Sequence, residues 1–166
     1  MQFQLKPLHA ESVPRALDKA ERYRLLNEPR EAESICRDVL ACDADNQRAI
    51  ATLALALTDQ FRDGELGRTA KEAEALAGRL SNAYERAYHL GLVAERSAKA
   101  KELRGVPGFY VYEGLRRAMA FFEEAERLHP DGNEDAVLRW NTCARMVMAD
   151  PRLVPESAPD VHPMTE

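Results

Sequence analysis

Apolar residues recur along the first part of the chain every three to four positions, the spacing that places them on one face of an α-helix. A first run contains Ala16, Ala20 and Tyr23, and a second run begins at Ala32. Pro29 stands between the two runs, and proline suits the first turn of a helix but not its interior. The pattern therefore predicts two amphipathic helices joined by a short turn.

The same arrangement returns 34 residues further along the chain. Ala20 is matched by Ala54, and the positions around them also pair apolar with apolar or small with small. Self-similarity at a fixed period of this length is typical of stacked helical repeats. We therefore expect a second pair of helices over about residues 47–60 and 64–78.

A third pair departs from this period because it contains additional residues. Its first helix is expected over about residues 81–98, and Gly91 takes the small position that Ala54 holds in the pair before. The small residue of its second helix, Ala118, lies 27 positions after Gly91, whereas the corresponding residues of the first pair lie 12 positions apart. About fifteen residues are thus inserted, and we place them over residues 99–112.

The two ends of the chain differ from this helical middle. A last helix is expected over about residues 133–149, where it would cover the third pair as a cap. The segment 150–166 holds four prolines and few apolar residues, a composition that predicts disorder. Residues 1–12 form a lead-in, so the expected helical domain spans residues 13–149.

One segment late in the chain carries the spacing A-x3-F-x2-A-x4-P, through Ala118, Phe122, Ala125 and Pro130. This motif resembles the second helix of the tetratricopeptide repeat, a family whose period is also 34 residues. The resemblance implies an all-α fold, a right-handed superhelix of about three helical hairpins with a C-terminal capping helix. It further implies that small residues let paired helices approach closely and that the aromatic side chain fills the space between neighbouring hairpins.

The resemblance also implies a binding surface. In this family the first helices of successive hairpins line a concave groove that holds extended peptides or partner helices. The corresponding positions here are Leu17, Glu21, Arg24, Arg48, Leu55, Glu85, Tyr88 and Leu92. Some members of the family bind the C-terminal carboxylate of a peptide through lysine and asparagine side chains of the groove. This chain has other residues at those positions. Ordinary packing within the molecule is the alternative interpretation for each groove residue.

The inserted segment and the two residues after it, KAKELRGVPGFYVYEG, have the most distinctive composition of the chain. The segment supplies Arg104 together with the aromatic residues Phe109, Tyr110 and Tyr112. Arginine and aromatic residues are enriched in binding hot spots, and long loops in compact folds are often functional. One interpretation is a contact surface; the other is that the segment extends both flanking helices and packs its aromatics onto their own hairpin.

The overall charge and the apolar runs narrow the range of partners. A net charge of −5 argues against nucleic acid, whose phosphates are bound by basic surfaces. The longest strongly apolar run, 49–57, is far shorter than the ~20 residues that cross a membrane. The N-terminus has no apolar signal core. We therefore expect a cytoplasmic protein without a membrane partner.

Candidate chemistry is sparse. Cys36 and Cys42 have five residues between them, which matches no zinc spacing, and an odd count of three cysteines argues against a disulfide framework. His89 has Glu85 four residues before it but no further ligand in local reach. Motifs of metalloproteases, hydrolases and phosphate-binding loops do not occur. We expect no catalytic residue, no metal ligand, no cofactor and no enzymatic activity.

These observations favour a protein–protein interaction module. Such an adaptor or scaffold would bind a peptide or partner protein through the concave groove and the aromatic insertion. The first alternative is a dedicated secretion-type chaperone, since acidic proteins of about this length with three tetratricopeptide hairpins resemble that class. The second alternative is a helical-repeat protein that binds a small ligand or acts as an enzyme.

Overall fold

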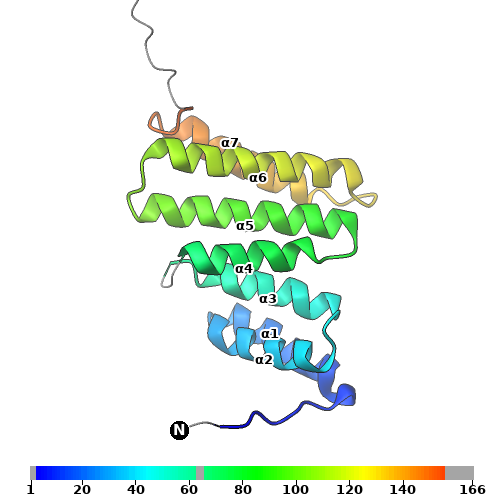
Figure 1. Cartoon of the computed structure of the whole chain (residues 1–166). Helices are drawn as coiled ribbons and strands as arrows, with labels where there is room; N and C mark the ends of the chain where they lie inside the picture. The colour runs from blue at the N-terminus through cyan, green and yellow to red at the C-terminus, as the bar shows by residue number, and fades with distance from the viewer. Residues whose placement is uncertain (1–2, 63–65, 156–166) are drawn as a thin grey trace, which may run out of the picture.

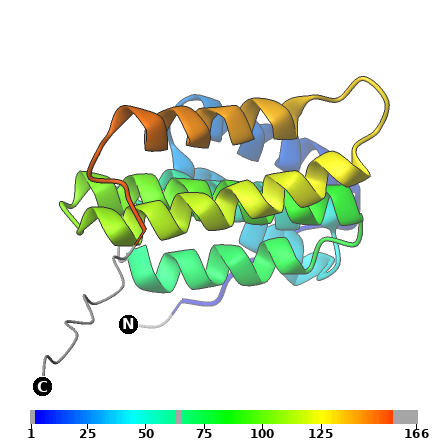
Figure 2. The ribbon, with the colours of Figure 1, turned by 90° about the horizontal axis from the view of Figure 1, so that it is seen from above.

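The computed structural model describes residues 3–62 and 66–155. Within these residues the chain forms seven α-helices and no strand, and each helix packs against the next one along the chain (Figure 1). The expectation of an all-α fold is confirmed. Seen along the stack, α7 runs on one side of α6 and α4 lies on the other (Figure 2).

The first pair of helices is α1, Val13–Leu25, and α2, Pro29–Cys42. Pro29 occupies the first turn of α2, where its missing N–H leaves no hydrogen bond unmade. Asn27, in the turn, has a φ of 60°, a left-handed conformation that asparagine tolerates better than most residues. The prediction of two helices separated at Pro29 is confirmed.

The second pair is α3, Gln47–Asp59, and α4, Leu66–Gly78. The Asn46 side chain caps α3, because its oxygen accepts a hydrogen bond of 3.0 Å from the backbone N–H of Ala49. Phe61 is the second residue after α3 and is 2% exposed, so it closes the end of this pair. Both helices agree with the predicted ranges over the described residues.

The additional residues of the third pair, placed at 99–112, extend its two helices, α5 and α6, as the second interpretation of this segment has it. The helix α5 runs Ala83–Leu103 and α6 runs Gly108–Leu128, so only residues 104–107 of that segment lie outside a helix. Each of these helices has 21 residues against 13 in α3 and α4, a difference of eight. Eight residues add about 12 Å of helix. We call residues 99–112, which project beyond α3 and α4, the overhang (Figure 1).

Two glycines shape the turn within the overhang. Gly105 has a φ of +69°, a left-handed conformation that glycine adopts without strain. A Cβ atom at Gly108 would lie 2.2 Å from the backbone oxygen of Arg152, so only glycine lets the start of α6 meet the segment after α7. The overhang is therefore held from above by the C-terminal part of the chain.

The last helix is α7, Asp135–Ala149, in the range predicted for the cap. Residues 150–155 follow it, and Leu153 is buried at 4% exposure within the core formed by α5, α6 and α7. The packed part of the chain thus reaches past Asp150, where a disordered tail is predicted to begin. The remainder of that predicted tail, 156–166, lies outside the described residues.

Two hydrophobic cores run through the stack. The first joins α1 to α4 with Val93 and Ala100 of α5, and the second joins α5, α6 and α7. In the second core Gly91 faces the ring of Phe122, and a Cβ atom at Gly91 would lie 2.5 Å from Phe122 Cε1. This close approach of α5 and α6 requires a residue without a side chain at Gly91.

Candidate functional site

A pocket of about 400 Å³ lies where the ends of α1 and α3 meet the overhang. The last turns of α1 and α3 and the last two turns of α5 supply its walls, so residues far apart in the sequence come together there. We call this the overhang pocket. Its lining consists of Arg24, Leu25, Asn27, Thr58, Asp59, Phe61, Arg62, Arg96, Lys99, Ala100 and Leu103.

Asp59 holds the centre of the pocket by pairing with two arginines from neighbouring helices. Arg24 Nε donates to Asp59 Oδ2 at 2.8 Å, and Arg96 Nη1 donates to Asp59 Oδ1 at 2.5 Å. Arg96 Nη1 also donates to Thr58 Oγ1 at 2.6 Å. The three first helices, α1, α3 and α5, are therefore tied together at one point.

Both arginines keep hydrogen-bond donors that this network does not use. A guanidinium offers five N–H donors in a planar fork. Among the described residues, neither amino group of Arg24 has a hydrogen-bond partner, and the same holds for Nε and Nη2 of Arg96. The pocket therefore presents oriented, unused donors of the kind that carboxylates accept in pairs.

A buried acidic residue stands behind the pocket wall. Glu95 is 0% exposed, and its Oε1 is bonded to Lys99 Nζ and lies 3.5 Å from Arg139 Nη1 of α7. The other oxygen, Oε2, has no hydrogen-bond partner among the described residues. The carboxylate of Glu95 thus partly neutralises the charge of Lys99. Its attraction to Arg139 also holds α7 against α5.

Two large apolar side chains flank the pocket. Leu25 ends α1 and is 88% exposed, and Leu103 ends α5 and is 66% exposed. Leucines at this exposure gain nothing from the fold, whereas burying one against a partner contributes about 1.5–3 kcal/mol. The pocket therefore combines an apolar edge with a polar interior.

The predicted groove residues divide into three groups. Leu17 and Leu92 are 3% and 4% exposed in the core, which corrects their placement on a binding surface. Glu21 and Arg48 pair with each other, Nε to Oε1 at 2.7 Å, and Arg48 holds the pKa of the Glu21 carboxyl below its usual range. Arg24 alone lies in the overhang pocket.

The remaining groove residues lie further along the stack. Leu55 and Tyr88 are half-buried and pack against the core of α5, α6 and α7. Glu85 is exposed in the first turn of α5, with its Oε2 3.4 Å from His89 Nδ1. The predicted groove is therefore not brought together as one open surface.

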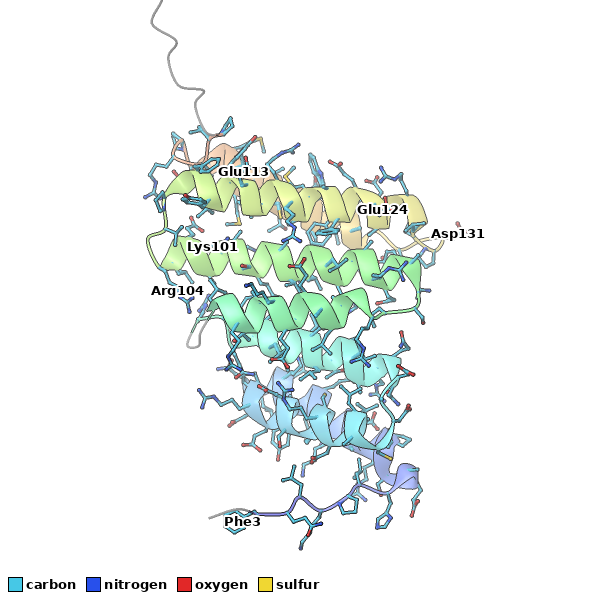
Figure 3. The ribbon with its side chains drawn as sticks, in the orientation of Figure 1. Phe3, Lys101, Arg104, Glu113, Glu124 and Asp131 are labelled. Carbon is cyan, nitrogen blue, oxygen red and sulfur yellow. The ribbon has the colours of Figure 1, made fainter. Side chains whose placement is uncertain are left out.

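The aromatic residues of the overhang also divide. Tyr112 packs against the core of α5, α6 and α7, while Phe109 is half-buried with its ring 5.1 Å from that of Tyr110. Tyr110 is 55% exposed. Arg104, at the projecting end of α5 (Figure 3), donates from Nη2 to the backbone oxygen of Phe61 at 2.7 Å. Most of this cluster thus supports the hairpin, as the second interpretation of the insertion has it.

Sequence reasoning missed the residues that build the pocket with Arg24. Asp59 lies 35 positions after Arg24, and Arg96 lies 37 positions after Asp59. These distances are close to those that relate Ala20, Ala54 and Gly91 along the same helices. Charges of alternating sign at equivalent positions of successive repeats are a signal that the sequence contains.

Other chemistry is limited among the described residues. No group of three or more histidine, cysteine or acidic side chains there could hold a metal ion. Burial raises the pKa of the Cys36 and Cys143 thiols to about 12, which leaves both far from the reactive thiolate at neutral pH. Over the same part of the chain, no helix has the length and apolar character needed to cross a membrane.

Comparisons with protein-family models, with curated proteins and with solved structures found no match to this chain. The function must therefore be inferred from its own residues.

Proposed function

We propose that this protein is an interaction module that binds a peptide segment of a partner protein in the overhang pocket. The observation that carries the proposal is the pairing of exposed Leu25 and Leu103 with unused arginine donors in one pocket. Interface hot spots combine apolar anchors with arginine in this way. The proposal includes no catalytic step.

The proposal extends to the architecture. We take the three antiparallel pairs as a superhelix of the tetratricopeptide type, with α7 as its cap. Support comes from the 34-residue spacing of Ala20 and Ala54, which are both fully buried, and from the close contact of Gly91 with Phe122. Because α1, α3 and α5 are the first helices of their pairs, the pocket lies on the helices that bind partners in that family.

A pocket of this composition suits a peptide better than a small metabolite. Only part of its lining is apolar, and the apolar side chains with the largest exposure, Leu25 and Leu103, belong to its edge. Small-molecule sites instead bury most of the ligand among apolar walls. A peptide can cover the edge and place one polar side chain inside.

Selection from a displayed library of random peptides tests this proposal. We expect the protein to enrich a peptide family, and the double variant Leu25→Ser/Leu103→Ser to bind those peptides at least about tenfold more weakly, since two buried leucines are lost. The matched control is Leu138→Ser, because Leu138 is 62% exposed on α7, away from the pocket.

Both variants should keep the helix content of the parent protein, because the changed side chains are exposed. Failure to enrich any peptide family would overturn the proposal. So would equal binding of the selected peptides by the double variant and by the Leu138→Ser control.

A further inference from the structure

We infer that the segment taken by the overhang pocket is acidic, with carboxylate side chains next to bulky apolar ones. This inference rests on the proposed function and names the chemistry of its partner. It is carried by the charges that line the pocket and by the donors that its arginines keep free.

The pocket is positively charged although the chain carries a net charge of −5. Among the lining residues that the structure describes, four side chains are basic, Arg24, Arg62, Arg96 and Lys99, and one, Asp59, is acidic. Glu95, behind the wall, adds a second negative charge through Lys99. Even with both acids counted, the basic side chains remain in excess, so an anionic group is favoured there over a cationic one.

The arginines are also held in position before any ligand arrives. The Asp59 carboxylate accepts hydrogen bonds from Nε of Arg24 and Nη1 of Arg96. These bonds hold the two arginine side chains, of α1 and α5, in place against α3. A ligand carboxylate can then accept hydrogen bonds from their remaining N–H groups. Donors that are already ordered lower the entropic cost of binding.

The helix dipoles at the pocket favour a peptide over a small free anion as its ligand. The pocket lies at the C-terminal ends of α1, α3 and α5, where each helix dipole contributes a partial negative charge of about one half within the last turn. These partial charges reduce the excess of positive charge in the pocket, so a small anion gains little. A peptide adds contacts of its apolar side chains with Leu25 and Leu103, which a free phosphate or carboxylate lacks.

Single-stranded RNA is the alternative anionic ligand for a basic pocket. RNA-binding sites of that type stack bases on exposed aromatic rings. The aromatic residue of the pocket lining is Phe61, which is 2% exposed and unable to stack on a base. The exposed apolar side chains among the described lining residues are Leu25 and Leu103, which favour a peptide.

The composition of the selected peptides tests the inference. We expect enriched peptides to contain Asp or Glu beside Leu, Ile, Phe or Met, and to lose about tenfold in affinity when their acids are changed to the amides Asn and Gln. Their affinity should also fall as salt is raised, because exposed charges are screened.

Variants of the protein then locate the contact. Arg24→Lys/Arg96→Lys keeps every charge and the pairs with Asp59 but loses the forked donors, so the acidic peptides should bind about tenfold more weakly. Arg62→Gln should weaken binding about threefold, the effect of one exposed charge pair. Arg145→Gln, an exposed arginine of α7 outside the pocket, removes the same charge and should change nothing.

The outcomes separate this inference from the proposed function. The selection could enrich neutral or basic peptides whose binding is still lost in the variant Leu25→Ser/Leu103→Ser. That result would overturn the inference of an acidic partner but not the proposed interaction module. Equal loss in Arg62→Gln and Arg145→Gln would also overturn the inference, as would a single-stranded RNA that binds more tightly than the acidic peptides. No enriched peptide at all would overturn the proposed function itself.

Discussion

The second and third pairs of helices have the same antiparallel layout but differ in length, and the difference creates the candidate site. Each helix of α3 and α4 has 13 residues and finds neighbours on both sides along its length. Each helix of α5 and α6 has 21 residues, so its projecting end has no helix of the second pair beneath it. The pocket forms at this step in the stack.

The apolar residues near the helix ends reflect this difference. In the second pair, Leu57 and Phe61 are 3% and 2% exposed, whereas Leu103 at the end of α5 is 66% exposed. Where one pair of helices is longer than the pair before it, apolar residues at its projecting end remain exposed.

The largest expected effect concerns the two cores that these regions contain. Phe122→Ala in the second core should lower the free energy of unfolding by about 3–5 kcal/mol, and Leu53→Ala in the first core by about 2–5 kcal/mol. Both side chains are at most 2% exposed. Urea unfolding followed by circular dichroism measures both, and we expect one shared transition in each variant. Two separate transitions would show that the regions fold independently.

Glycines of the two regions should respond in opposite ways. Gly91→Ala should cost about 1–3 kcal/mol, because its Cβ would lie 2.5 Å from the Phe122 ring. Gly67→Ala in α4 should be neutral or stabilise by up to about 1 kcal/mol, because nothing lies within 4 Å of that Cβ. The melting temperatures of the two variants, each compared with that of the parent protein, test this prediction. A neutral Gly91→Ala would contradict the close contact of α5 with α6.

A smaller effect is expected from the ion pair between the first two pairs of helices. Arg48 lowers the pKa of Glu21, so the pair stabilises the fold above the usual pKa of a glutamate and loses this contribution as pH falls through the lowered value. Glu21→Gln should cost about 0.5 kcal/mol at neutral pH, since the pair is solvent-exposed. The difference should vanish once the pH is well below the lowered pKa of the Glu21 carboxyl. A cost that is independent of pH would contradict the ion pair.

The reaction rates of the cysteines with a thiol reagent show how easily each region opens, and the measurement needs no mutation. Cys42 is exposed and should react at once with a thiol reagent, while Cys36 and Cys143 are buried, with pKa values of about 12. We expect Cys143 to react before Cys36, because Cys143 belongs to α7, the last helix of the stack. Mass spectrometry of timed labelling gives the order. Faster reaction of Cys36 would place the less stable region at the N-terminal end.

The sequence predicted the helices well where their ends carry chemical signals. Pro29 marks the start of α2, and Asn46 marks the start of α3 through its capping oxygen. The overhang was harder to predict, because a count of inserted residues cannot distinguish a loop from longer helices. Within 99–112 the helix-breaking residues are confined to Gly105–Gly108, and the residues before them, KAKEL, are strong helix formers.

The candidate site was less predictable than the fold. The pocket depends on Asp59 accepting from Arg24 and Arg96, and this contact arises only when α1, α3 and α5 lie side by side. Periodicity identifies which face of a helix is apolar but not which charged ends meet. The resemblance to tetratricopeptide hairpins places Leu17 and Leu92 in a binding groove, but both lie in the core.

The most direct test of the overhang pocket is a nuclear magnetic resonance titration of the labelled protein with a selected peptide. If the account is right, the shifted backbone amides will cluster at the ends of α1, α3 and α5, around Leu25, Asp59 and Leu103. Shifts confined to α7, or spread over the faces of α2 and α4 with none at those three ends, would contradict it.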